Sequence, residues 1–363
     1  MNLTEVISKI RSVEDLILFG AQTIAYEIYI ALSEVFQIKP KCFLVSSMEN
    51  NPKDIDDIPV IPLSSYQPIN GQLILVATPQ PYHGQIVELL SEYENVDYMC
   101  VDSQLEYIIL SEYFRKKTPF KLLEDYSVEG VKGSQSADFR IMMAKSHFDV
   151  PLKFPPDIKK WVYPIHVGAA MTDKDITSIK DNSGENISMK NRNYCELTAT
   201  YWLWKNIRSD YKGLFHYRRT LELDKKDLEK VLSNDIDVVL PLPYVCNPDT
   251  SGQYKRYISS EDIQLTFDIL GRMRPEYYNA AQSILADKYL YNYNMLIAKA
   301  DVFNDFCNWL FPLLEEIEKH YSEKSICRED RYIGYIGELL TSLYFLYNRN
   351  NLKIAHGKKI WFI

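Results

Sequence analysis

The sequence predicts an α/β protein made of two domains, and three observations support that class. Short apolar runs alternate with amphipathic segments along the chain, which is the pattern of strands and helices that pack as layers. A length of 363 residues is sufficient for two hydrophobic cores. A composition with 46% hydrophobic and 25% charged residues is that of a globular chain, not of a disordered one.

Residues 1–116 are predicted to form the first domain, a Rossmann-like sheet. The expected helices cover 1–14, 22–36 and 82–93, and the expected strands cover 15–20, 41–46, a run around 61, 72–77 and 96–101. This alternation is typical of a doubly wound parallel sheet. The first strand-to-helix turn has only Gly20 and Ala21, where a dinucleotide fingerprint has three glycines. The turn therefore argues against an oxidoreductase or epimerase that binds a nicotinamide dinucleotide.

Residues 117–158 are predicted to be a linker region. This segment holds Gly130, the glycine- and serine-containing run 133–136 and several prolines, all of which interrupt regular structure. The second domain is then predicted to cover 159–363. It is expected to start with a strand over 161–168, which ends in a glycine and a polar loop.

The central stretch, 182–219, holds more polar and aromatic groups than any other segment. Here the sequence predicts a polar loop and then a helix of about four turns, capped by Asn191 or Asn193. Glu196 has the spacing of a capping-box partner for Asn193. The apolar run 213–215, flanked by turn residues, predicts a short buried strand.

Four polar residues follow that strand, namely His216, Tyr217, Arg218 and Arg219. Ligands of open α/β sheets bind outside the carboxyl ends of the strands, where two arginines could grip a diphosphate through forked hydrogen bonds. The alternative is that both arginines are surface residues that pair with acidic residues of the next segment. Those residues are Glu222, Asp224 and Asp227.

The rest of the second domain is predicted to continue the alternation of helices and strands. Expected helices cover 227–232, 259–271, 275–286, 300–321 and part of 325–347, expected strands cover 237–241 and 291–298, and a long polar loop covers 244–256.

Charge and cysteine usage exclude several classes of protein. A net charge of −8 argues against a nucleic acid partner, which normally selects a basic surface. No apolar run approaches 18 residues and the start of the chain has no leader pattern, so we expect a cytoplasmic protein that does not span the membrane. The six cysteines have no short paired spacing and are expected to be reduced core residues.

Seven separated motifs in the second domain carry a resemblance to a known family. They cover 181–188, 194–198, 201–206, 213–219, 294–297, 309–311 and 331–340. In this order they resemble the bacterial glycosyltransferase family known as domain of unknown function 4422, over residues 160 to about 350. The resemblance says nothing about residues 1–150.

The resemblance implies a GT-A-like glycosyltransferase domain. It implies transfer of a sugar from a nucleotide-sugar donor, such as a UDP-sugar, to a lipid-linked glycan in capsule, exopolysaccharide or O-antigen synthesis. Some members are assigned as galactofuranosyltransferases. A lipid-linked acceptor also implies peripheral contact with the inner face of the cell membrane. The alternative is a non-catalytic scaffold or nucleotide-sugar-binding subunit of a polysaccharide assembly complex.

The metal requirement stays open at this stage. GT-A enzymes usually hold Mn²⁺ or Mg²⁺ with an Asp-x-Asp pair at the end of the fourth strand, but here the segment 216–219 takes that place. Two other pairs have the right spacing. Asp173 with Asp175 lies in a loop before the central stretch, and Asp235 with Asp237 precedes its strand instead of ending it.

Site residues are assigned on these motifs. Glu338, with Asp330 second, is the expected catalytic base, because Gly334 and Gly337 would allow close approach of substrate. The alternative for Glu338 is an ordinary carboxylate near a helix start. The expected donor-binding residues are His216, Arg218, Arg219, Asn182, Asn186, Ser188, Gly168 and Lys205. The expected acceptor-binding residues are Arg331, Asn294 and Tyr254.

Two aromatic segments have two interpretations each. Tyr201, Trp202 and Trp204 could line the donor cleft, although their helical spacing is more typical of core packing. The run 353–363 combines lysines with a tryptophan and a phenylalanine, a composition suited to a membrane interface. It is also typical of a final strand whose apolar residues cover the second domain.

Overall fold

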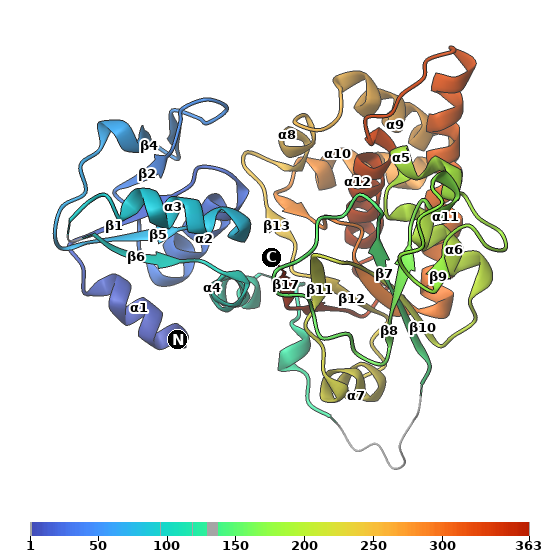
Figure 1. The fold of residues 1–363 in the computed structure, drawn as a ribbon, viewed down its shortest axis with the longest axis horizontal. Coiled ribbons are helices and arrows are strands. Elements are labelled where there is room, and N and C mark those ends of the chain that lie inside the picture. The colour runs from blue at the N-terminus through green and yellow to red at the C-terminus, as the bar shows by residue number, and fades with distance from the viewer. Residues whose placement is uncertain (1, 95, 118, 129–136, 363) are drawn as a thin grey trace. The chain divides into compact units, whose positions relative to one another are not determined.

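The computed structural model describes residues 2–94, 96–117, 119–128 and 137–362 (Figure 1). Contacts divide the chain into two compact units, each with its own sheet. The first unit holds the chain up to Thr118 together with Tyr244–Asn247, and the second holds Pro119–Pro243 and Pro248–Phe362.

The first unit is a six-stranded sheet with the order β3-β4-β2-β1-β5-β6. Its strands are β1 (Asp15–Phe19), β2 (Cys42–Val45), β3 (Asp54–Ile55), β4 (Ile58–Pro62), β5 (Gln72–Val76) and β6 (Asp97–Cys100). Its helices are α1 (Leu3–Arg11), α2 (Thr23–Phe36), α3 (His83–Leu90) and α4 (Ser103–Arg115). All pairs are parallel except β3 with β4. The α/β class and the doubly wound sheet are therefore confirmed.

The turn after β1 shows why this unit needs a glycine there. Gly20 has φ +122°, and a Cβ atom at this position would lie 2.5 Å from the backbone oxygen of Ala77. The close approach joins the ends of β1 and β5. The glycine thus serves packing of the sheet itself. The sequence analysis predicted no element between β6 and the linker region, but α4 forms there, and the Asp102 carboxylate caps it by accepting from the Leu105 amide at 2.9 Å.

The second unit is built on a mixed sheet with the order β16-β12-β15-β10-β7-β8-β9. These strands are β7 (Phe139–Lys145), β8 (Val162–His166), β9 (Ile179–Lys180), β10 (Tyr211–His216), β12 (Val238–Pro241), β15 (Leu296–Lys299) and β16 (Ile354–Gly357). Strand β15 runs antiparallel to both of its neighbours, β10 and β12, and the other pairs along this path are parallel. β11 (Arg219–Leu221) and β17 (Lys359–Trp361) pair with each other beside β10.

Eight α-helices of the second unit lie among the described residues. They are α5 (Asn191–Tyr194), α6 (Leu197–Asn206), α7 (Lys225–Ser233), α8 (Thr250–Tyr254), α9 (Ser260–Met273), α10 (Pro275–Leu285), α11 (Ala300–Glu323) and α12 (Tyr332–Tyr347). Helices α6 and α11 pack on β10, and α12 packs on α5, α10 and α11 (Figure 1). The short strands β13 (Tyr244–Val245) and β14 (Tyr289–Leu290) form a separate two-stranded sheet.

The predicted linker region, 117–158, needs a correction. It contains β7, a buried strand that lies between β10 and β8 in the sheet. Prolines and glycines on both sides hid the apolar run 139–144, which is long enough for a central strand. The glycine- and serine-containing part of the prediction, 130 and 133–136, falls outside the described residues.

The predicted four-turn helix is two helices, α5 and α6. Cys195, between them, has φ 51°, so the chain turns out of helical geometry there. The Asn191 amide stabilises this break by donating to the Cys195 carbonyl at 2.7 Å and to the Thr198 hydroxyl oxygen at 3.0 Å. Glu196 is therefore not the capping-box partner of Asn193.

Two further segments differ from expectation. The predicted polar loop 244–256 includes β13 and α8, and Asp249 caps α8 by accepting from the Gly252 amide at 2.7 Å. The predicted strand 291–298 begins only at Leu296, because Tyr293 and Asn294 both have positive φ.

The run 353–363 forms strands β16 and β17 as far as it is described. β16 is a member of the sheet and β17 pairs with β11, so the structure favours the final-strand interpretation over a membrane-facing tail. No described helix is both long and apolar enough to cross a bilayer.

Candidate active site

The site is centred on the carboxyl end of β10, a central strand of the second sheet. The strand is buried between β7 and β15, and a Cβ atom on Gly213 would lie 2.7 Å from the Leu296 carbonyl oxygen. After Phe215 the chain leaves this dense core. His216, Arg218 and Arg219 then place polar groups at the edge of the sheet, partly accessible to solvent.

The His216 side chain bonds to other residues of the protein. Its Nε2 lies 2.6 Å from the Tyr293 carbonyl oxygen and 3.9 Å from a Glu196 carboxylate oxygen. Burial lowers the pKa of His216, although Glu196 opposes this effect. A neutral imidazole that donates to the carbonyl is the form consistent with both observations. His216 therefore orders the 291–295 loop, and this bond occupies its Nε2.

Arg218 and Arg219 present donors suited to an anion. The Nε atom of each is buried and has no hydrogen-bond partner within the described residues. The Arg219 guanidinium lies between two rings, with its Cζ 3.8 Å from the centre of the Trp361 ring and 4.0 Å from that of Tyr293. Stacking of this kind fixes the plane of the fork, and a planar fork matches the geometry of a phosphate group.

Glu338 lies on α12, close to Glu196 and to the cations Arg219 and Arg331. Burial, reinforced by the nearby Glu196 carboxylate, raises the pKa of Glu338 to about 8. A backbone hydrogen bond from Tyr293 and the charges of Arg219 and Arg331 oppose this rise. A carboxyl group with a pKa near the working pH is suited to general acid or base catalysis.

A buried hydrogen-bond chain holds Glu196 in place beside this carboxyl group. Asn294 donates from Nδ2 to Glu196 at 2.8 Å and accepts from the Thr341 hydroxyl at 3.0 Å. Asn294 is thus buried with both ends of its amide engaged. It positions Glu196, and its amide is not aimed at an acceptor as the sequence suggested.

Arg331 stands at the start of α12 with φ 64°. Its Nε donates to the Cys195 sulfur at 3.2 Å. Burial raises the pKa of the Cys195 thiol to about 12, so the sulfur stays protonated at neutral pH. Arg331 is an exposed residue, and its charge lies close enough to Glu338 to lower the pKa of that carboxyl group.

The two glycines of α12 allow close packing of helices. A Cβ atom on Gly337 would lie 2.5 Å from the Leu197 side chain, and one on Gly334 would lie 3.1 Å from the Cys195 sulfur. These glycines let α12 lie against α5 and α6. The expectation that they admit substrate is replaced by this packing role.

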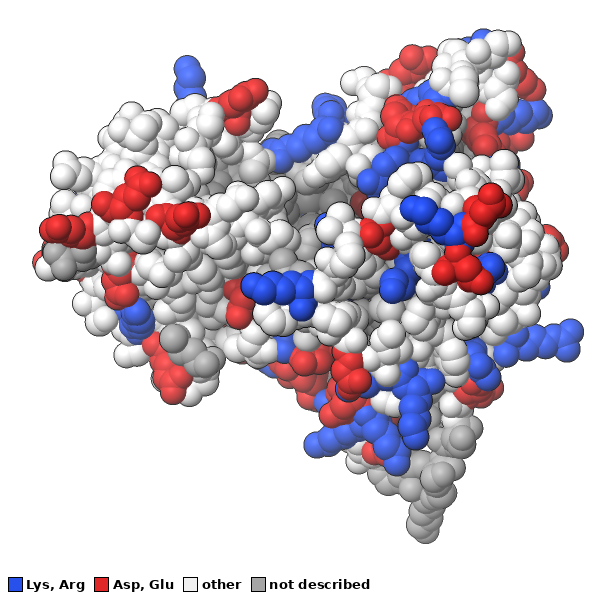
Figure 2. All heavy atoms as spheres, viewed as in Figure 1, with Lys and Arg blue, Asp and Glu red and all other residues white. Residues whose placement is uncertain are grey.

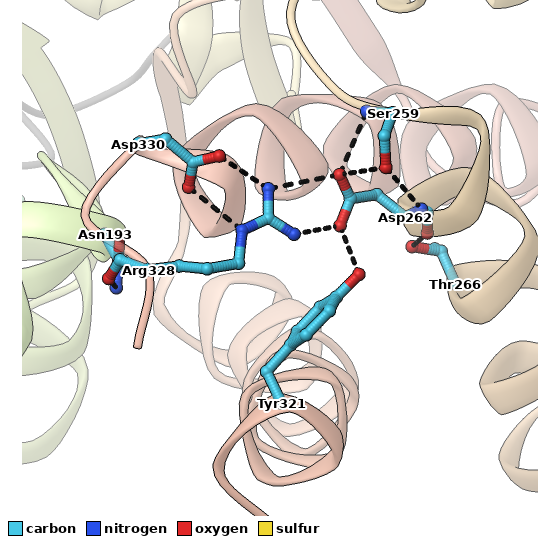
Figure 3. Close-up of polar contacts among 7 residues, drawn as sticks. All are labelled: Asn193, Ser259, Asp262, Thr266, Tyr321, Arg328 and Asp330. Atoms are coloured by element: carbon cyan, nitrogen blue, oxygen red, sulfur yellow. Dashed lines mark hydrogen bonds and ion pairs between the residues drawn. The ribbon is translucent and has the colours of Figure 1, made fainter. Parts of the chain in front are cut away.

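Asp330, the second candidate base, belongs to a different network (Figure 3). Its carboxylate accepts from Arg328 at 3.1 and 2.6 Å. Arg328 also pairs with Asp262, which is fully buried and accepts a further bond from Tyr321 at 2.6 Å. Asn193 donates to the Arg328 carbonyl at 2.7 Å. Asp330 thus helps to hold the segment before α12.

Gly168 and Ser188 form an internal scaffold. Asp181 is fully buried and accepts from the amides of Gly168 and Ala169, at 2.8 and 3.0 Å, and from the Ser188 hydroxyl. Ser188 in turn accepts from the Ala170 amide at 3.0 Å. The hydroxyl of Ser188 is therefore occupied by the protein.

Asn182, Asn186 and Lys205 lie on an exposed loop and the adjoining face of α6. The Asn186 amide bonds within its own loop, to the Gly184 carbonyl at 2.9 Å. Lys205 pairs with Glu185 at 3.2 Å and lies 3.7 Å above the Trp204 ring. These three residues make no described contact with the cluster around Glu338.

The aromatic candidates pack within the protein. Trp204 stacks on Phe311 with ring centres 5.6 Å apart, and Trp202 donates to the Ser183 carbonyl at 2.9 Å. Tyr254 is buried in α8, 1% exposed. Such burial leaves Tyr254 no accessible surface for a ligand in this conformation.

The described residues do not fit a divalent metal ion. Among them, no group of three or more His, Cys, Asp or Glu side chains is arranged to hold one. Asp235 and Asp237 both pair with Lys299, at 2.6 and 2.7 Å, and Asp175 pairs with Lys180 at 3.3 Å.

Sequence reasoning missed three residues that shape the site, namely Glu196, Tyr293 and Trp361. Glu196 was interpreted as a helix cap, although its place inside the second motif was a usable signal. Tyr293 and Trp361 reach Arg219 from segments distant in sequence. No local pattern points to such contacts.

Comparison with known proteins agrees with this architecture. One solved structure, described as the WbbM bifunctional glycosyltransferase in its apo form, matches with a TM-score of 0.51 and 26% identity. The match covers 62% of this chain and 45% of that one, so this chain spans less than half of that protein. The likeness defines a GT-A-like α/β fold.

Residues 143–350, more than half of the chain, match the family described as Domain of unknown function (DUF4422), and the chain belongs to that family. The resemblance found from the motifs is thereby confirmed. No sequence among the curated proteins matches.

Proposed function

We propose that this protein is a glycosyltransferase that moves a sugar from a nucleotide-sugar donor to a glycan acceptor. One observation carries the proposal. A carboxyl group with a pKa near 8, Glu338, lies beside the cations Arg219 and Arg331 at the carboxyl end of the central strand β10. Membership of the family and the likeness to a solved glycosyltransferase support it.

The arginines would hold the donor. A nucleoside diphosphate leaving group gathers negative charge as the glycosidic bond to the donor breaks. Preorganised cations that face this charge stabilise it more than water does. We assign the diphosphate to Arg218 and Arg219, whose buried Nε donors have no protein partner within the described residues.

Glu338 would act on the acceptor. In its ionised form it takes the proton from the acceptor hydroxyl while that oxygen attacks the anomeric carbon, which inverts the configuration there. Glu196 raises the pKa of this carboxyl group and so makes it a stronger base. Arg331, next to it, would orient the acceptor hydroxyl or the departing phosphate.

For the specific substrates, we propose a UDP-sugar donor, with galactofuranose among the candidate sugars, and a lipid-linked acceptor in capsule, exopolysaccharide or O-antigen synthesis. These choices rest on the family resemblance of the motifs. A non-catalytic nucleotide-sugar-binding subunit remains the second candidate. The raised pKa of the half-buried Glu338 argues against it, since binding alone has no need of a carboxyl group with a pKa raised to about 8.

A thermal-shift screen against nucleotide sugars, followed by a transfer assay with the stabilising donor, tests the proposal. A donor that binds the folded state raises its melting temperature. The expected result is a rise with one class of donor and release of the nucleoside diphosphate when an acceptor is added. A rise without any turnover, by transfer or hydrolysis, would favour the binding subunit.

A further inference from the structure

The loop between β7 and β8 exposes apolar side chains to an unusual degree. Residues 146–160, here called the β7–β8 loop, contain no helix or strand. Four large apolar side chains in it are exposed, namely Phe148 (75%), Val150 (62%), Phe154 (63%) and Ile158 (48%). Exposed apolar residues grouped in this way mark an interaction surface more often than chance exposure does.

Local bonds hold the tip of the loop in this arrangement. The Asp149 carboxylate accepts from the Ser146 amide at 2.7 Å, and the Asp149 amide donates back to the Ser146 carbonyl at 3.0 Å. Phe148 donates its amide to the Ser146 hydroxyl at 3.3 Å and packs on the His147 ring. Three prolines further restrict the backbone. The outward position of Phe148 is therefore built into the turn.

Lysines accompany the apolar residues. Lys153, Lys159 and Lys160 are all exposed, and the Lys153 ammonium lies 5.4 Å from the centre of the Phe154 ring. Asp157 offsets one of these charges by pairing with Lys159 at 2.9 Å. Figure 2 shows both acidic and basic side chains over the face in view. With three lysines against Asp149 and Asp157, the loop has a formal charge of +1 (3 − 2) on a chain of net charge −8, and it is rich in exposed apolar side chains.

We propose that the β7–β8 loop docks on an anionic lipid surface, with Phe148 and Phe154 entering the headgroup region. Aromatic rings favour that depth, and lysines place their ammonium groups among lipid phosphates while their stems lie along apolar surface. Each lysine near an anionic membrane adds favourable electrostatic free energy. A protein partner would be expected to meet a continuous groove or sheet edge, whereas here single apolar side chains alternate with lysines and prolines.

The loop is also tied to the candidate site. Tyr217, between His216 and Arg218, receives a backbone hydrogen bond from Val150 and interacts with Asp149. Docking would therefore bring the end of β10 close to the lipid headgroups. This inference deepens the proposed function, because it rests on a lipid-linked acceptor for its biological use, but the binding itself needs no turnover.

Vesicle flotation tests the inference with the full chain. We expect binding to vesicles that contain phosphatidylglycerol and weak binding to pure phosphatidylcholine. Phe148→Ser with Phe154→Ser should reduce the bound fraction by about tenfold or more, since each ring contributes apolar area. Lys153→Glu with Lys160→Glu should reduce binding similarly at low salt. At high salt, where the electrostatic attraction is screened, this variant and the wild type should bind equally.

Met189→Ser with Ile326→Ser is the matched control, because both residues are exposed apolar side chains outside the loop (68% and 45%). Equal losses in the control and loop variants, or unchanged binding by the loop variants, would overturn the inference. So would a dimer in solution that the Phe148 and Phe154 changes dissociate, since the loop would then cover a second copy. Every variant should keep the wild-type melting temperature.

Activity separates this inference from the proposed function. Loop variants should retain transfer to a short water-soluble acceptor and lose it with an acceptor embedded in vesicles. Vesicle binding without any transfer would count against the proposed function alone. Transfer without loop-dependent vesicle binding would count against the docking surface alone.

Discussion

The two sheets of this protein differ most at the carboxyl ends of their strands. In the first unit, β1, β2 and β5 are followed by 20–22, 46–48 and 77–79, which contain no charged or histidine side chain. In the second unit, β10 leads straight into His216, Arg218 and Arg219. These three strand ends of the first sheet therefore lack the cations that follow β10 in the second sheet. Fold alone does not locate function, whereas the residues at these ends do.

Removing the titrating group from the second unit should have the largest effect. We expect Glu338→Gln to lower transfer by about 10²- to 10⁴-fold, as loss of a general base does. Donor binding, measured by thermal shift, should persist because the arginines remain. Wild-type turnover in Glu338→Gln would show that another residue is the base. Glu196→Gln would then be the next variant to assay.

The network in Figure 3 sets the conformation of the segment before α12. Arg328→Met leaves the fully buried Asp262 without its cation and should cost about 3 kcal/mol in free energy of unfolding. Arg272→Met, which breaks the exposed pair with Glu316, is the control and should cost less than about 1 kcal/mol. Equal denaturant midpoints for the two variants would contradict this ranking.

Arg219→Ala should reduce kcat/KM by about 10- to 100-fold through loss of a charged hydrogen bond to the donor. Arg218→Ala is expected to act similarly. Arg219→Lys separates charge from geometry, because an ammonium group keeps the charge but cannot present a planar fork between Trp361 and Tyr293. Full activity in Arg219→Lys would show that the stacked fork is unnecessary.

The raised pKa of Glu338 gives the second unit two pH signatures. As a base, it must be ionised, so kcat/KM should rise with pH and level off above about 8. For stability, the folded state holds the proton between the ordinary value of 4.5 and about 8, so wild-type stability relative to Glu338→Gln should fall as pH rises through that window. Parallel stability profiles for the two proteins would contradict the shift.

The first unit supplies the smallest expected effect. Gln22, in the turn after β1, donates to the Asn51 side chain at 2.7 Å and so ties this turn to the segment between β2 and β3. Gln22→Ala should change transfer by less than about twofold, since surface substitutions away from special features are nearly neutral. A large loss of activity would show that the first unit takes part in the reaction and would break the contrast drawn above.

Sequence reasoning located the elements whose patterns are local. The strand and helix alternation of the first unit, β10 and the long helix α11 all follow from runs of apolar residues. Arg218 and Arg219 were found because they follow a predicted buried strand, and Glu338 because it belongs to a family motif. Their individual roles remain predictions.

Contacts between distant segments could not be predicted in this way. Asn294 reaches Glu196 across 98 residues, and its positive φ depends on packing that no single segment encodes. Asn186, Lys205 and Ser188 belong to the same polar stretch as the arginines, yet in the fold they bond to residues other than the cluster around Glu338. Residue type indicated chemical capacity, and only the fold decided which groups meet.

The stacking of Arg219 between the Tyr293 and Trp361 rings also determines when the site can form during synthesis. A nascent chain that has emerged as far as β11 already carries both arginines, but the rings of Tyr293 and Trp361 follow much later. Until β17 has paired with β11, the guanidinium lacks the Trp361 ring, one of the two rings that fix its plane. Domains fold as units during translation. Donor affinity should therefore appear abruptly, on ribosome-bound chains extended past Trp361, and not build up gradually as the sheet grows.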